Sequence, residues 1–96
     1  MELQYKPIPL EFALQSAYPN PFNPITTLKF GLPVESKVSI QIYNLQGQVV
    51  STLLNDNIEA GFHTVIWNAD AYSSGVYLVK MIAREYIDTQ KLMLVK

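Results

Sequence analysis

The chain contains no cysteine among its 96 residues. This absence excludes disulfide bonds, cysteine-based zinc sites and thiol nucleophiles, so the fold must be stabilised by packing. Charge of one sign is also scarce, because seven Lys and Arg residues stand against eight Asp and Glu residues, which gives a formal net charge of −1. The chain therefore lacks the basic surplus that recognition of a phosphate backbone needs, and we expect no nucleic-acid partner.

Long hydrophobic runs are missing as well. The longest apolar runs are far too short to cross a bilayer, so we expect no membrane-spanning segment. Residues 1–12 lack a basic region followed by an apolar core, and we expect no signal peptide in them. Hydrophobic residues nevertheless make up 49% of the chain, which is too many for a disordered segment. At this length, the composition predicts one globular domain, which we expect to be monomeric.

Proline is concentrated in one segment. The stretch AYPNPFNPITTLKFGLP, residues 17–33, holds four of the six prolines. Proline fixes φ and removes a backbone donor, so Pro19, Pro21 and Pro24 cannot lie inside a helix or pair freely in a central strand. We therefore expect an extended segment that leads into a sheet.

Alternation of apolar and polar residues begins at this segment and continues to the C-terminus. In KVSIQIYN, residues 37–44, the apolar side chains fall on every second position, which predicts a half-buried strand. A loop at Asn44–Gly47, with glycine at a position of positive φ, predicts a hairpin to the run that follows. We expect a strand that ends at the Gly31–Pro33 breaker, a turn at Asn55–Asn57, a strand opened by Gly61 and another at Val76–Ile82, directly after Gly75.

Strands at this spacing are typical of an antiparallel sandwich. With a first strand at Leu10–Gln15, we expect about seven strands, the number that an all-β, immunoglobulin-like sandwich of about 100 residues requires. Trp67 should be the most valuable core residue, and its replacement by Ala would cost about 3–5 kcal/mol if it is buried. The inward face of the last strand is ambiguous. Ile87 is in step with Met93 but out of step with Leu92, so either a bulge or burial on both faces is possible.

The sequence offers few catalytic groups. His63 is the only histidine, and we interpret it as a residue at the rim of a strand rather than a general base. The acidic residues Asp56, Asp70 and Asp88 are scattered and form no calcium loop; Asn55–Glu59 is better explained as a solvated turn than as a cation site. We expect no catalysis, metal or cofactor. The six tyrosines suggest a carbohydrate-binding face, but we favour half-burial on a pleated sheet as their explanation.

The order of the motifs resembles one family. YPNPFNP at residues 18–24 is followed by TTLKFGLP, VSIQIYNLQGQVV, AGFHTVIWNA, SSGVYLVKM and a terminal KLMLVK. From Phe12 to Lys96 this order is similar to the type A C-terminal sorting domain of the type IX secretion system of diderm bacteria. The individual residues that match the family are Pro19, Asn20, Pro21, Phe22, Asn23, Pro24, Ile42, Tyr43, Asn44, Gly47, Ala60, Gly61, His63, Trp67, Asn68, Ser74, Gly75, Val76, Tyr77, Lys91 and Lys96.

The resemblance implies a signal made of folded structure. Cargo reaches the periplasm by the general export route, and the type IX translocon and its shuttle proteins then recognise the domain and pass the cargo to the cell surface or outside. In such systems a sortase-like peptidase removes the domain and attaches the cargo to surface lipopolysaccharide, or the cargo is released. A sandwich suits this role because a strand edge and a tail can bind a partner by strand addition.

On this interpretation, residues 1–10 are a linker from an upstream cargo domain and residues 11–96 form the sorting domain. Candidate recognition residues lie around the Ser-Gly-Val-Tyr motif and in the last expected strand, Gln90–Lys96; they are Gly75, Val76, Tyr77, Lys91, Leu94, Val95 and Lys96. The alternative is a non-catalytic immunoglobulin-like accessory module that binds carbohydrate or is related to the hook-capping flagellar domains. For Gly75, a purely structural role in the sheet is at least as well supported.

Overall fold

The computed structural model describes residues 7–96, and this part of the chain is all β. Every strand pairing is antiparallel, and the described residues contain no helix, so none that could cross a membrane. The strands are β1 (Ala13–Leu14), β2 (Ile25–Leu32), β3 (Ser36–Tyr43), β4 (Val49–Ile58), β5 (Gly61–Asn68), β6 (Gly75–Ala83) and β7 (Tyr86–Leu94). The prediction of about seven strands in an antiparallel sandwich is confirmed.

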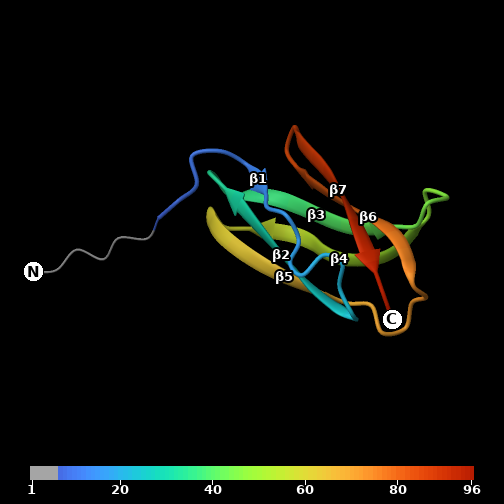
Figure 1. Cartoon of the computed structure of the whole chain (residues 1–96). Helices are drawn as coiled ribbons and strands as arrows, with labels where there is room; N and C mark the ends of the chain where they lie inside the picture. The colour runs from blue at the N-terminus through green and yellow to red at the C-terminus, as the bar shows by residue number, and fades with distance from the viewer. Residues whose placement is uncertain (1–6) are drawn as a thin grey trace, which may run out of the picture.

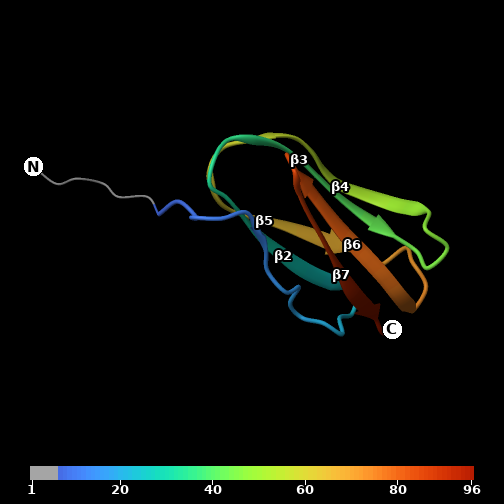
Figure 2. The ribbon, with the colours of Figure 1, turned by 90° about the horizontal axis from the view of Figure 1, so that it is seen from above.

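The strands form two sheets, which Figures 1 and 2 show as two layers. The smaller sheet has the order β1-β2-β5, and the larger has the order β4-β3-β6-β7. In a constant-type immunoglobulin domain, the fourth strand lies beside the fifth. Here β4 pairs with β3 in the other sheet, so β5 becomes an edge strand.

The core lies between the two sheets and follows the predicted alternation. On β3 the side chains of Val38, Ile40 and Ile42 are buried, and their neighbours on the opposite face are partly exposed. On β2 the buried set is Thr26, Leu28 and Phe30, which also occupy every second position. Apolar burial of this kind is the dominant stabilising term in a domain without disulfides.

The hairpin between β3 and β4 has the predicted loop. Gly47 has a φ of +82°, a conformation that favours glycine, and the Oδ1 atom of Asn44 accepts hydrogen bonds from the N–H groups of Gln46 and Gln48. The predicted turn at Asn55–Asn57 is wrong, because β4 continues through these residues to Ile58. Pairing with β3 outweighs the low strand preference of Asn and Asp there.

The ends and faces of two strands also differ from the expectations. β2 extends through Gly31 to Leu32, past the predicted breaker, because β5 pairs with it that far. The last strand runs from Tyr86 to Leu94, earlier at both ends than the predicted Gln90–Lys96. Its register with β6 is continuous, and Leu92 and Leu94 point inward while Ile87, Met93 and Val95 are exposed, so no bulge is needed.

A cluster of aromatic rings fills one end of the core. Trp67 is buried, and its ring centroid lies 5.5 Å from that of Phe22, 5.5 Å from that of Tyr72 and 5.3 Å from that of Tyr77. The hydroxyl of Tyr77 donates to the carbonyl of Ser73. Within residues 7–96, the buried Nε1 atom of Trp67 has no hydrogen-bond partner.

The proline-rich segment is extended, as predicted, and it connects the two sheets. The N–H and C=O groups of Tyr18 bond to Thr27 of β2. Four residues further on, Phe22 forms a parallel bridge beside Leu94 of β7. The peptide bonds before Pro19, Pro21 and Pro24 are cis. The segment therefore closes one long side of the sandwich.

Candidate recognition surface

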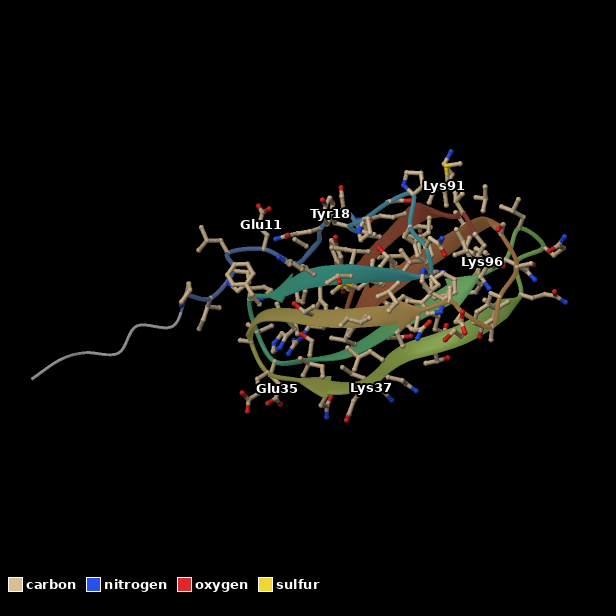
Figure 3. All side chains as sticks on the ribbon, turned by 60° about the horizontal axis from the view of Figure 1, so that its bottom comes forward. Glu11, Tyr18, Glu35, Lys37, Lys91 and Lys96 are labelled. Atoms are coloured by element: carbon tan, nitrogen blue, oxygen red, sulfur yellow. The ribbon has the colours of Figure 1, made fainter. Side chains whose placement is uncertain are left out.

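Most of the predicted recognition residues meet at one end of the domain. β6 begins where β7 ends, so Gly75 lies opposite Leu94, and Tyr77 lies opposite Leu92. Val95 and Lys96 follow directly after β7. Lys91 lies on β7 three residues before Leu94, and its partner on β6 is Leu78. In Figure 3 Lys91 and Lys96 both lie toward the end of the domain that is distant from Glu11.

The candidate residues divide into a surface group and a buried group. Tyr77 and Leu94 are buried in the core, where a partner cannot reach their side chains without unfolding the domain. Val76 is partly buried. The exposed candidates are Gly75, Lys91, Val95 and Lys96.

Gly75 has both an unusual backbone conformation and open space around it. Its φ is +154°, which L side chains rarely adopt, and apart from its two chain neighbours no described residue has an atom within 4 Å of the position that a Cβ would occupy. A shallow cleft of about 460 Å³ adjoins it, lined by residues 44–46, 50 and 71–77. The glycine is required by its backbone conformation rather than by close packing.

The C-terminal tail is held against this end of the domain. The N–H of Lys96 donates to the Oγ atom of Ser74 at 3.0 Å, and its Nζ atom donates to the carbonyl oxygen of Asp70. The N–H of Val95 donates to the carbonyl oxygen of Phe22 at 3.0 Å. The tail and the start of β6 therefore form one surface, which is held in place by the main chain of Phe22. We call it the tail surface; it consists of Asp70, Ser74, Gly75, Val76, Val95 and Lys96.

The outer edge of β7 is closed beside this surface. The side-chain amide of Asn20 donates to the carbonyl of Lys91 at 2.9 Å and accepts from the N–H of Met93 at 3.0 Å. The N–H of Phe22 donates to the carbonyl of Met93 at 2.9 Å. Asn20 and Phe22 thus take the place of a neighbouring strand over the stretch from Lys91 to Val95. From the sequence, Asn20 was only one of the residues that match the family motif, because its hydrogen-bond partners lie more than 70 residues away.

A second set of side chains closes the rest of this side. The Gln90 side chain donates to the carbonyls of Leu14 and Gln15 and accepts from the N–H of Ala17. The hydroxyl of Tyr86 accepts from the N–H of Leu14 and donates to Asp88. Burial raises the pKa of Tyr86 above its usual value. The hydrogen bond from Leu14 lowers this pKa, whereas the negative charge of Asp88 raises it further.

The residues considered for catalysis or ligand binding do not converge. His63 packs on Phe30, and its Nε2 atom lies 2.8 Å from the main-chain oxygen of Glu59 rather than from a carboxylate. Residues 7–96 contain no group of three or more His, Cys, Asp or Glu side chains that could hold a metal ion. Tyr5 lies outside the described residues, and of the five tyrosines inside them only Tyr18 is exposed. Tyr77 is buried, and Tyr43, Tyr72 and Tyr86 are partly buried, which agrees with the half-burial that we favoured from the sequence.

The domain is a small antiparallel sandwich with two distinctive parts. These are the proline-rich segment, which bonds to both sheets, and the C-terminal tail, which is hydrogen-bonded to the start of β6 and to Phe22. A family model described as the secretion system C-terminal sorting domain matches residues 16–96. No curated protein and no solved structure gives a significant match. Because the match covers most of the chain, the chain belongs to the family of type IX secretion C-terminal sorting domains, and it carries a sorting signal for that system. Membership implies fusion to a cargo protein and secretion toward the cell surface or the extracellular space.

Proposed function

We propose that this domain sorts its cargo by presenting the tail surface to the type IX translocon and its shuttle proteins, and that it performs no catalysis itself. The observation that carries the proposal is the anchoring of Val95 and Lys96 beside Gly75. A tail held by Phe22 and Ser74 adopts a defined shape only when the sandwich is folded. Recognition of this shape would therefore select folded domains.

Within the tail surface, the candidate residues have different roles. The exposed side chains of Val95 and Lys96 would contact the partner, together with Lys91 at its border. Tyr77 and Leu94 would support the surface from the core, and Gly75 would supply its backbone conformation. Val76 would contribute its partly exposed side chain. This division assigns every candidate residue either to contact or to support.

The N-terminal side would connect the domain to its cargo. Residues 1–10 would form the linker and residues 11–96 the sorting domain. Pro7 to Leu10 lie outside the seven strands, and Pro9 packs against Gly31, where an added Cβ would come within 2.8 Å of its ring. In Figure 2 the start of the described chain and the C-terminus lie at opposite ends of the domain. Cargo attached at one end would leave the tail surface accessible to the translocon, and to a sortase-like peptidase that removes the domain.

The test is export of a reporter fused ahead of residues 1–96 in a host with a type IX system. Truncation of β7 is a poor variant, because it removes the buried side chains of Leu92 and Leu94 and would unfold the domain. Val95→Asp is a better variant, because Val95 is 51% exposed and its replacement changes the surface without opening the core. Its matched control is Val49→Asp on β4, where Val49 is 48% exposed.

We expect the unaltered fusion and the Val49→Asp variant to reach the surface or the medium. The Val95→Asp variant should stay in the periplasm with an unchanged circular dichroism spectrum. Retention of the unaltered fusion would count against the sorting role of residues 1–96. Export of Val95→Asp at the level of the unaltered fusion would show that the tail surface is not what the translocon reads.

A further inference from the structure

The two outer strands of the smaller sheet are not equally protected. The β1 side is covered by the segment that runs from Leu14 to Phe22 and bonds to β7. On the other side, β4 pairs with β3 in the larger sheet, so no strand of the described chain pairs with the outer edge of β5. Figure 1 shows β5 as the outermost strand of its layer.

The hydrogen-bond pattern shows which groups lie on this edge. In β2 the N–H and C=O of Thr27 bond to Tyr18, on the side away from β5. Main-chain groups alternate in direction along a strand, so Leu28 and Phe30 bond toward β5, where their partners are Val65 and His63. The intervening residues of β5 direct their N–H and C=O groups outward; these residues are Phe62, Thr64 and Ile66.

This edge also lacks the features that usually prevent strand addition. Residues 61–68 contain no Asp, Glu, Lys, Arg or Pro, and the register with β2 is continuous. Phe62 is 57% exposed to solvent and Ile66 is 61% exposed. By contrast, β4 has two register shifts and carries Asp56. Bulges and charges are common means of blocking an edge, and β5 has neither.

The flanking charges indicate what kind of strand would fit. Glu59 precedes β5 and Asp70 follows it, and both are exposed. A strand lying along β5 would therefore meet a carboxylate near each end and apolar side chains between them. A second copy of β5 fits poorly: if Thr64 paired antiparallel with Ile66 of the other copy, Glu59 of each molecule would approach Asp70 of the other.

We propose that the outer edge of β5 binds an extended polypeptide segment by strand addition, and that this segment has alternating apolar residues with a Lys or Arg at each end. The inference rests on the proposed function in one respect, namely that the segment belongs to a component of the secretion machinery. Strand addition supplies main-chain hydrogen bonds to Phe62, Thr64 and Ile66, and the end charges set the position of the segment. The main-chain groups of this edge are separate from the tail surface, which the edge adjoins at Asp70.

Binding is tested on the purified domain with a synthetic probe, the peptide Lys-Thr-Val-Thr-Val-Thr-Val-Lys. Its titration into ¹⁵N-labelled protein should shift the amide signals of Phe62, Thr64 and Ile66 most strongly. The same peptide with Glu at both ends should bind at least about tenfold more weakly. Because this measurement requires no export, it separates failure of the edge from failure of the sorting role.

Two pairs of variants identify the binding edge. Ile66→Lys places a cation on the edge, and Ile87→Lys is its control, because Ile87 is 59% exposed on β7. Thr64→Pro removes one outward N–H without breaking a bond to β2, and Asn55→Pro does the same on the outer edge of β4. Ile66→Lys and Thr64→Pro should each weaken peptide binding at least tenfold, whereas both controls should bind as the unaltered domain does.

Three results would overturn the proposal. The first is the absence of peptide-induced shifts on β5 at millimolar peptide. The second is equal binding by Thr64→Pro and the unaltered domain. The third is self-association of the domain through β5, seen by sedimentation velocity as a dimer that Ile66→Lys dissociates, because the occupant would then be a second copy.

Discussion

The two long sides of the sandwich are built in opposite ways. On one side, the segment from Ala13 to Phe22 lies between the edges of the two sheets and bonds to both. On the other side, β4 and β5 end their sheets with no strand beyond them in the described chain. The first side is closed by the chain itself, and the second is open to solvent.

The difference follows from how each edge can be satisfied. Unpaired main-chain groups at a sheet edge attract other strands unless they are covered. β7 is covered by the main chain of Phe22 and by the side chain of Asn20, which has both a donor and an acceptor. Proline suits the covering segment because it stiffens an extended backbone that cannot itself become a regular strand. The closed side therefore stabilises the domain, and the open side is available to a partner.

The largest contrast is between one phenylalanine on each side. Phe22 is buried against Trp67, whereas Phe62 is exposed on β5. We expect Phe22→Ala to lower the free energy of unfolding by about 3–5 kcal/mol, because it leaves a cavity beside Trp67 and weakens the packing of the proline-rich segment on the core. Phe62→Ala should change it by less than about 0.5 kcal/mol. Urea unfolding measures both, and equal effects would remove the distinction between the two sides.

A smaller contrast is between two glutamines. The Gln90 side chain makes three hydrogen bonds to the main chain of the covering segment. Gln90→Ala should lower the unfolding free energy by about 1–3 kcal/mol, since it leaves partly buried main-chain groups without partners. Gln41→Ala, which removes only exposed or local side-chain contacts on β3, should cost less than about 0.5 kcal/mol. A Gln90→Ala variant as stable as Gln41→Ala would mean that β7 needs no such closure.

Asn20 allows the closure to be tested one bond at a time. Asn20→Ala should speed exchange of the Met93 amide by about tenfold, which corresponds to about 1.4 kcal/mol, while the Val95 amide keeps its bond to Phe22. Asn20→Asp retains the acceptor for Met93 and loses only the donor to Lys91, so it should preserve slow exchange. Hydrogen exchange followed by NMR gives both rates. Fast exchange in Asn20→Asp would contradict the assigned geometry.

Strand faces were predictable from the sequence because burial on one side of a sheet imposes a period of two. The buried residues Val38, Ile40 and Ile42 follow directly from that rule. The pairing of β4 with β3 also followed, from the Asn44–Gly47 loop, but the end of β4 did not, because residues 49–58 have no strict period and Asn55–Asn57 predict a turn. Pairing with β3 as far as Ile58 decides where β4 ends, and this pairing outweighs the low strand preference of Asn and Asp.

The site was predictable only in part, for a similar reason. Family motifs pointed to Gly75 and Lys96, which the structure brings to one end of the domain. Strand addition at the last strand was an attractive hypothesis from sequence, yet Asn20 and Phe22 already occupy that edge from Lys91 to Val95. Of the two edges that remain unpaired in the described chain, β5 is the one without a register shift or a charged residue, and it is recognisable only once the strand order is known.

The smallest expected effect concerns pH on the closed side. Burial raises the pKa of Tyr86, so the folded domain holds the phenol proton more tightly than the unfolded chain, whose tyrosine pKa is about 10. The resulting stabilisation is complete below pH 10 and is lost as pH rises through 10 toward the folded value. We expect Tyr86→Phe to be less stable near neutral pH, because Leu14 loses its acceptor, and to show a shallower decline in stability between pH 9 and 11. Urea unfolding between pH 9 and 11 gives the slope of the unfolding free energy against pH for each protein. Parallel slopes for Tyr86→Phe and the unaltered domain would show that folding does not raise the pKa of Tyr86.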